Sequence, residues 1–232
     1  MKEVLRQERK YLITREQFHK FDTRYDRLLV PDEHNGHFGY LVRTLYFDTI
    51  DERDFYQREE GVELRRKIRL RTYDPDNDFA MLEVKQKHAN YQKKRSLRVS
   101  REDAIALTEG DYQCLIKMED PFAKECYAMM MTHTYRPKSI VEYNRKAYIA
   151  HENKIRITFD SNIRATESSF QLFDKKLNMN QVFDPYLMIL EVKYNGFMLS
   201  YIKDIISMDL NTNKAASKYC LSRSSGLHYV FQ

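Results

Sequence analysis

Apolar and charged residues alternate along several segments of this chain, a pattern typical of β-strands with two chemically different faces. The string LEVK occurs twice. In its first copy Glu83 and Lys85 share one strand face while Leu82 and Val84 lie on the other, and the second copy spans 190–193. If the apolar face packs against helices, the charged face must point inward. Such an inversion of an ordinary core usually has a functional cause.

The same pattern predicts about eight strands with helices between them. Strands are expected at residues 4–13, 40–49, 62–74, 79–87, 91–100, 139–150, 152–161 and 186–196. Helices are expected after Thr14, with Gln17 completing a capping box, after Asp51, after Ser100, and over residues 121–135, 197–208 and 215–226. Most connections are of the antiparallel type, and eight strands can close into a barrel around one small ligand.

Composition agrees with a single domain over residues 1–232, because β-barrels often reach this length. The net charge of +5 arises from 39 basic and 34 acidic residues, so a preference for anions must come from local clusters. No apolar run approaches the ~18 residues that span a membrane, and the N-terminus lacks the apolar segment of a signal peptide. Three widely spaced cysteines without a CxxC pair indicate free thiols, so we expect a cytoplasmic protein.

The densest charge lies on residues 62–74, where Arg65, Lys67, Arg69 and Arg71 fall on one strand face. The opposite face is mostly Leu and Ile and can pack against a core. A solvated surface strand is the ordinary explanation, but basic positions recur on other strands: Lys10, Lys85, Lys87, Lys93, Lys94, Arg95, Arg98, Arg145, Lys154, Arg156 and Lys193. So many confined like charges repel one another and resist desolvation, and a bound polyanion would resolve both problems.

Carboxylates are interspersed among these cations, namely Glu83, Glu142, Glu191 and Asp160. They could neutralise part of the basic rows. Together with phosphate oxygens, they could instead hold Mg²⁺ or Mn²⁺.

Three short strings recur in the same order along the chain. ERKYLI at 8–13 resembles NRKAYI at 144–149, IRLRTYD at 68–74 resembles IRITFDS at 155–161, and LEVK is repeated. This order predicts two pseudo-equivalent halves, each contributing basic and acidic side chains to one cavity.

These segments resemble the triphosphate tunnel metalloenzymes, and among them the VTC domain of the polyphosphate polymerase type. The resemblance rests on a series of strings that span nearly the whole chain: ERKYLI, LYFDT, Gly61 with LRRKIRLRTY, LEVKQK, KKRSLRV, VEYNRKAY, IRITFDSNI, LEVKYNG and SKY. It implies an α+β fold, an eight-stranded antiparallel β-barrel with helices packed outside. The interior of this barrel would be a basic tunnel that binds triphosphate or polyphosphate with a divalent metal.

The resemblance also implies roles for individual residues. The implied catalytic residues, which hold the phosphates, are Lys10, Arg69, Arg71, Lys85, Lys94, Arg145, Arg156 and Lys218, with Lys93 or Arg95 as alternatives to Lys94. Glu191 matches the metal-binding glutamate of the family, and Glu83 and Glu8 are further candidate ligands of Mn²⁺ or Mg²⁺. Further candidates for substrate binding are Lys67, Lys87, Lys193 and Lys214, the last standing beside Ala215, where the family pattern can carry a lysine.

One departure separates two branches of this superfamily. The hydrolytic CYTH branch has ExExK on its first strand, whereas this chain has Arg6, Glu8 and Lys10 at those positions. Loss of one carboxylate weakens binding of a second metal and favours phosphotransfer over hydrolysis. Three functions stay open: a polyphosphate polymerase that uses the γ-phosphate of ATP, a tripolyphosphatase or nucleoside triphosphatase, and a non-catalytic module that binds polyphosphate or another anion.

The expected partners are therefore ATP and polyphosphate or triphosphate. A membrane partner of the kind the family has would be a separate chain, and the sequence does not indicate an oligomeric state. No nucleic-acid-binding signature occurs. His34 and His37 lie in a Gly-containing loop without partner ligands, which favours a surface loop over a zinc site.

Overall fold

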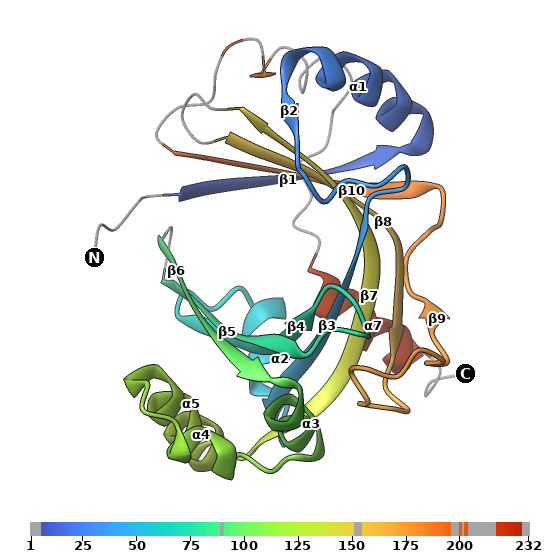
Figure 1. The fold of residues 1–232 in the computed structure, drawn as a ribbon. Coiled ribbons are helices and arrows are strands. Elements are labelled where there is room, and N and C mark those ends of the chain that lie inside the picture. The colour runs from blue at the N-terminus through green and yellow to red at the C-terminus, as the bar shows by residue number, and fades with distance from the viewer. Residues whose placement is uncertain are drawn as a thin grey trace. The chain divides into compact units, whose positions relative to one another are not determined.

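The computed structural model describes residues 6–88, 91–150, 155–195, 200, 202–203 and 217–228. Its strands are β1 (Arg6–Thr14), β2 (Val30–Pro31), β3 (Tyr40–Thr49), β4 (Arg65–Thr72), β5 (Phe79–His88), β6 (Tyr91–Ser100), β7 (Tyr135–Ala150), β8 (Ile155–Thr166), β9 (Asn180–Gln181) and β10 (Leu187–Asn195). Its helices are α1 (Arg15–Leu28), α2 (Arg53–Glu59), α3 (Arg101–Glu109), α4 (Gln113–Lys117), α5 (Pro121–Thr132) and α7 (Lys218–His228). Figure 1 shows these elements along the chain.

The fold is α+β, as the sequence predicts, with one large antiparallel sheet. Its strand order is β1-β10-β8-β7-β3-β4-β5-β6, and the two-residue strands β2 and β9 pair with β7 and β8. The path therefore contains the eight strands that were expected. Within the described residues it is an open sheet that ends at β1 and β6.

Contacts divide the chain into two compact units, which we describe one at a time. Unit 1 comprises residues 1–41, 143–163 and 181–217, and unit 2 comprises residues 42–142, 164–180 and 218–232. The organisation of residues 1–232 as a single domain stays a prediction.

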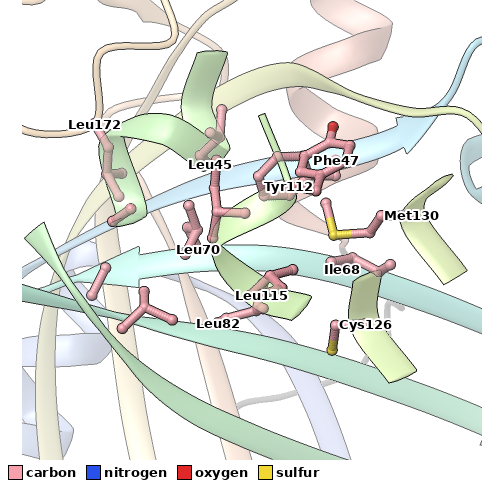
Figure 2. Close-up of a cluster of buried hydrophobic side chains, with 14 of the residues drawn as sticks. Leu45, Phe47, Ile68, Leu70, Leu82, Tyr112, Leu115, Cys126, Met130 and Leu172 are labelled. Atoms are coloured by element: carbon pink, nitrogen blue, oxygen red, sulfur yellow. The ribbon is translucent and has the colours of Figure 1, made fainter. Parts of the chain in front are cut away.

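In unit 2, one face of the β3–β6 sheet is apolar and packs beneath helices. Register places Leu45 opposite Leu70, Leu70 opposite Leu82, and Leu82 opposite Leu97. Residues of α3, α4 and α5 complete this core, including the fully buried Leu115 (Figure 2 shows the cluster). The helices lie together beside β5 and β6 in Figure 1. The predicted packing of the apolar face against helices is confirmed here.

Unit 1 repeats the same arrangement with different elements. Tyr11 of β1 lies opposite Leu190 of β10, which lies opposite Phe159 of β8. These side chains are buried in a second core, to which Phe18 and Phe21 of α1 contribute. Each unit thus has a sheet with one apolar face under helices, and its charged residues must occupy the other face.

The predicted N-terminal caps of two helices are confirmed. Thr14 and Gln17 form the predicted capping box, in which the Gln17 backbone N–H donates to Thr14 Oγ1 at 3.1 Å and the Thr14 N–H donates to Gln17 Oε1 at 2.8 Å. The Ser100 hydroxyl oxygen accepts from the Asp103 N–H at 3.0 Å at the start of α3.

Three predicted helix ends differ from the structure. The helix predicted over 121–135 ends at Thr132, because Tyr135 already belongs to β7. Helix α2 begins at Arg53, and Asp48 rather than Asp51 accepts its second and third amides, as described below. Helix α7 passes through Gly226 and ends at His228, so Gly226 is not the residue that terminates it. Most of the helix expected at 197–208 lies outside the described residues.

The recurring strings do not form two halves in chain order. The first LEVK strand, β5, pairs with β4 and β6, whereas the second, β10, pairs with β8 and with the N-terminal strand β1. Strand β1 therefore belongs to the unit of the second LEVK copy. Similarity of short strings carries no information about which distant strand completes a sheet.

Among the described residues, no helix is long and apolar enough to cross a membrane. Cys114, Cys126 and Cys220 are free thiols, as their spacing predicts.

Candidate functional site

The charged face of unit 2 is built by the registers of β4, β5 and β6. Arg69 lies opposite Glu83, and Glu83 lies opposite Ser96. The next row along the strands holds three lysines: Lys67 lies opposite Lys85, and Lys85 lies opposite Lys94. Two further rows add Arg71, and Arg65 with Lys87. We call this set of residues the unit 2 charged face.

Glu83 is the centre of this face and is 2% exposed. Its Oε2 accepts from Arg69 Nε at 2.7 Å and from Arg69 Nη2 at 2.6 Å, with Arg71 Nη1 at 3.7 Å. Its Oε1 is paired with Lys94 Nζ and receives the Ser96 hydroxyl at 3.5 Å. Burial alone would raise the pKa of Glu83, but Arg69, Arg71 and Lys94 lower that pKa to about 2. The cluster is three cations around one permanently ionised carboxylate.

The structure distinguishes Lys94 from the two neighbours that could have replaced it. Lys94 shares the charged face with Lys85 and Lys67. Arg95 points to the opposite side, where its guanidinium pairs with Glu125 of α5 and stacks over the Phe122 ring at 4.5 Å. Lys93 lies opposite Gln86 and is on the same side of the sheet as Arg95.

Unit 1 has its own charged face, on β1, β10 and β8. Lys10 lies opposite Glu191, and Glu191 lies opposite Thr158. In the adjacent row, Glu8 lies opposite Lys193, and Lys193 lies opposite Arg156. We call these residues, with Arg145 and Asp160, the unit 1 charged face.

Glu191 has three cations around it. Lys193 Nζ lies 3.1 Å from Oε2, Arg145 Nη2 lies 3.9 Å from the same oxygen, and Lys10 Nζ lies 3.6 Å from Oε1. Burial would raise the pKa of Glu191, but Lys193 and Lys10 hold that pKa well below its usual range. Lys10 also contacts Glu8 at 3.0 Å, so the lysine bridges two carboxylates. Although burial disfavours its charge, Glu191 and Glu8 raise the pKa of Lys10.

Arg145 is held by a bidentate ion pair with the fully buried Asp160. Nε and Nη2 of Arg145 lie 2.7 and 2.8 Å from the two carboxylate oxygens. Burial works against the charge of Arg145, yet Asp160 raises its pKa well above the ordinary value. This arginine is therefore a fixed positive charge beside Glu191.

Arg156 has two partners that the sequence did not indicate. Its Nη2 donates to Asp32 Oδ2 at 2.8 Å and to the Tyr40 hydroxyl at 3.1 Å. Both partners flank the loop that contains His34. Asn35 attaches this loop to β7, because its side-chain amide donates to the Ala147 carbonyl and accepts from the Ala147 N–H. The loop is the predicted surface loop, but its first residue orients a candidate phosphate-binding arginine.

The carboxylates of unit 1 fit a divalent cation better than Glu83 does. The described residues contain no group of three His, Cys, Asp or Glu side chains placed to hold a metal. Two carboxylates, Glu8 and Glu191, nevertheless meet at Lys10. Thr158 lies opposite Glu191, and its buried Oγ1 has no hydrogen-bond partner. Two carboxylates and an unsatisfied hydroxyl are oxygen ligands of the kind that a divalent cation prefers. The nitrogens around Glu191 lie 3.1 Å or more from its oxygens, whereas two nitrogens of Arg69 lie within 2.7 Å of Glu83.

Lys218 is the first residue of α7, and the next residue, Tyr219, anchors that helix in unit 2. The Tyr219 hydroxyl donates to Asp48 Oδ2 at 2.6 Å. Sequence reasoning missed Asp48, although it lies in the string LYFDT that carries the resemblance. Of the remaining candidates, Lys85 and Lys87 lie on the unit 2 charged face, and Lys214 falls outside the described residues.

Comparisons with known proteins identify a family and a fold for this chain. A family model described as the VTC domain matches residues 5–226. A structure from Bacillus halodurans assigned as an adenylate cyclase has a TM-score of 0.53 and 14% identity, covering 90% of this chain and 92% of that one. A Hippeastrum protein, named an adenylyl cyclase and described as having a dominant triphosphatase activity, has a TM-score of 0.58 and 13% identity, covering 94% and 95%. At these identities the two structures establish the fold alone.

No curated protein is similar enough in sequence to count as a match. The family match, however, covers nearly the whole chain and confirms the resemblance seen in the motifs. This protein belongs to the VTC domain family.

Proposed function

We propose that the chain binds a triphosphate or polyphosphate through its charged faces and transfers the γ-phosphate of ATP onto a polyphosphate chain. The observation that carries this proposal is the excess of cations on the unit 2 charged face. On the described residues of β4, β5 and β6, one carboxylate, Glu83, shares this face with Lys67, Arg69, Arg71, Lys85 and Lys94. Helices α3, α4 and α5 cover the opposite, apolar face, so the charged face is the side open to a ligand beyond the part that Tyr219 of α7 contacts. A polyanion balances this excess charge, and arginine suits phosphate oxygens because it binds them in a bidentate manner.

The chemistry requires no nucleophile from the protein. A terminal phosphate oxygen of the growing chain attacks the γ-phosphorus in line, the bond from that phosphorus to the β–γ bridging oxygen breaks, and ADP leaves with that oxygen. The acceptor becomes longer by one phosphate. Arg69 and Lys94 neutralise the developing charge, and their contacts with Glu83 fix their orientation before the substrate arrives.

A divalent cation belongs to the proposal as well. When bound, Mn²⁺ or Mg²⁺ neutralises phosphate oxygens and acts as a Lewis acid. Glu191 and Glu8 would hold it in unit 1. The role of Lys10, Lys193 and Arg145 is to keep Glu191 ionised, as the lowered pKa of Glu191 indicates.

A triphosphatase is the second candidate function. The Hippeastrum protein, which shares the fold at a TM-score of 0.58, is described by a dominant triphosphatase activity. Water would then replace the polyphosphate acceptor on the same charged faces. The cation that stands at position 6 in place of a carboxylate favours transfer over hydrolysis, because fewer acidic ligands activate water less well.

The decisive experiment incubates the protein with ATP, Mn²⁺ and a short polyphosphate primer, and follows both chain length on gels and free phosphate. We expect a ladder of long chains, which Lys94→Ala reduces about tenfold or more because it removes one charge-assisted phosphate contact. Arg95→Ala is the matched control, since this neighbouring cation faces α5 and should leave the ladder intact.

Each other outcome has a definite meaning. Free phosphate without a ladder would replace the polymerase proposal with the triphosphatase. Binding of polyphosphate without either product would identify a non-catalytic anion-binding module. Equal losses in Lys94→Ala and Arg95→Ala would show that the charged face of unit 2 is not the phosphate site.

A further inference from the structure

Tyr219 is an unusually constrained residue at the start of α7. Its side chain is buried, with 1% of the residue exposed, and its hydroxyl donates to Asp48 Oδ2 at 2.6 Å. Burial and the neighbouring Asp48 carboxylate both raise the pKa of Tyr219, so the phenol stays protonated and remains a donor. A buried hydroxyl paired with a buried carboxylate makes a strong, directional attachment.

Asp48 itself is fully buried and satisfied from several directions. Its Oδ1 accepts the N–H groups of Thr49 at 2.7 Å and Asp54 at 2.9 Å, and its Oδ2 accepts that of Phe55 at 2.9 Å. This one carboxylate thereby satisfies the second and third amides of α2 and anchors Tyr219 of α7. Because all of its donors are fixed by secondary structure, Asp48 is a rigid acceptor for Tyr219.

The ring of Tyr219 extends onto the unit 2 charged face. It stacks with Tyr46 at a centroid separation of 5.1 Å, and Lys67 Nζ lies 5.4 Å from its ring centre. Tyr46 lies directly opposite Arg69 in the sheet. Tyr219 therefore joins the first turn of α7 to the same rows of residues that hold the candidate phosphate ligands.

We propose that the Asp48–Tyr219 hydrogen bond is a positioning device for Lys218. The lysine is the first residue of α7 and adjoins Tyr219 in sequence, so fixing the tyrosine fixes the backbone from which the lysine extends. This inference rests on the proposed function, because Lys218 matters only where an anion binds. Asp48 and Tyr219 are positioning residues rather than catalytic ones: they act through Lys218.

The remaining contacts of α7 lie further along the helix. Ser222 and Ser139 share a hydrogen bond of 2.8 Å, and Arg223 pairs with Glu52 and, at 2.7 Å, with Glu167. These contacts keep α7 docked when the Tyr219 hydroxyl is removed. Tyr219→Phe should therefore loosen the first turn while the helix remains in place, and the phenyl ring keeps its stacking on Tyr46.

A double-mutant cycle on tripolyphosphate binding tests the proposal. Affinity is measured by calorimetry for the wild type, Lys218→Ala, Tyr219→Phe and the double variant. Lys218→Ala should weaken binding about tenfold, the loss of one charge-assisted contact. Tyr219→Phe should weaken it about fivefold, and the double variant should be no weaker than Lys218→Ala within about twofold, because both changes remove the same contact.

Tyr112→Phe is the matched control. Tyr112 is also buried in unit 2, with 2% of the residue exposed, and its hydroxyl donates to the Tyr135 carbonyl at 2.8 Å on the helix-covered side of the sheet. It should lose thermal stability to a similar degree but keep the full effect of Lys218→Ala. A purely structural role for Tyr219 predicts the same behaviour in both tyrosine variants, so that result would overturn the proposal.

The remaining outcomes separate the inference from the function on which it rests. Additive losses in the cycle would refute positioning while leaving Lys218 a phosphate ligand. Unchanged binding in both Lys218→Ala and Arg69→Ala would instead refute the proposed function. If Tyr219→Phe does not fold, Tyr46→Leu removes the stacking partner of Tyr219 and should show the same non-additivity with Lys218→Ala; additivity there would count equally against the proposal.

Discussion

At the scale of single residues, the two LEVK glutamates have the same sequence context and different surroundings. Glu83 lies opposite Arg69, which binds it through two nitrogens at 2.6 and 2.7 Å. Glu191 lies opposite Thr158, whose hydroxyl is unsatisfied, and its nearest cation, Lys193, stands 3.1 Å away. The difference comes from the neighbouring strand rather than from the motif. A motif can therefore predict a buried carboxylate, but the cross-strand partner determines whether that carboxylate orients arginines or has capacity for a metal.

This difference gives a prediction about metal binding. Glu191→Gln should lower the affinity for Mn²⁺ at least about tenfold, since changes even outside the direct ligands of a metal cost 10- to 100-fold. Glu83→Gln, which removes the same charge from the other LEVK copy, should change that affinity much less. Electron paramagnetic resonance of free Mn²⁺ during a titration measures both. A larger loss of Mn²⁺ affinity in Glu83→Gln would show that the metal site is in unit 2.

A second residue-scale prediction concerns Asp54, which is buried beside Asp48 and accepts the Tyr135 hydroxyl at 3.0 Å. Burial and the Asp48 charge raise the pKa of Asp54 to about 7. Between the unfolded pKa of about 4 and the folded pKa, the native protein keeps a proton that the unfolded chain has lost, so this group contributes stability at low pH that fades as pH rises.

Asp54→Asn removes that titration. Relative to the variant, the wild type should lose up to about 1.4 kcal/mol of unfolding free energy per pH unit between about pH 5 and pH 7. Urea unfolding across this range measures the two profiles. Profiles that run parallel would mean that Asp54 is not protonated in the folded protein near neutral pH.

At the scale of elements, the strands and their faces follow from the sequence because alternation is local information. Caps formed within three or four residues, such as Thr14 with Gln17, were equally accessible. Asp48 was not, because it acts on amides six and seven positions later and on a hydroxyl 171 positions away. The role of Asp32 could not be predicted for the same reason, since its partner Arg156 is 124 positions away in the sequence.

The approach of the loop before β3 to β7 gives an element-scale prediction. Gly39 has φ +84°, and a Cβ there would overlap the carbonyl oxygen of Arg145, while Gly110 has φ +87° with open space around it. Gly110→Ala should cost about 1 kcal/mol from backbone strain. Gly39→Ala carries the same strain and must also displace the backbone of Arg145, so we expect about 3 kcal/mol or more. Chemical denaturation compares the two; equal losses would mean that the loop can move away freely.

At the scale of the whole molecule, the sequence predicted the fold class and the family but not the grouping of its strands. The recurring strings suggested halves in chain order, and the structure instead places β1 in one unit with β10, about 180 residues later. Strand pairing over such distances depends on how complete sheets bury their apolar faces, which short strings do not encode. The family was still identified correctly, because its motifs mark positions within single strands and do not depend on which strands pair.

Charge at this scale gives the last prediction. The net charge is only +5, yet the cations gather on two sheet faces, so a polyanion should stabilise the folded protein far more than net charge alone suggests. Tripolyphosphate at about 100 times its dissociation constant should add about 2.7 kcal/mol, or roughly 5–10 °C in Tm. The affinity should fall as salt rises and screens the exposed cations. Orthophosphate, which spans fewer cations, is the control in the same thermal-shift series. Equal shifts with both anions would mean that the charged faces hold isolated phosphates and do not recognise a chain.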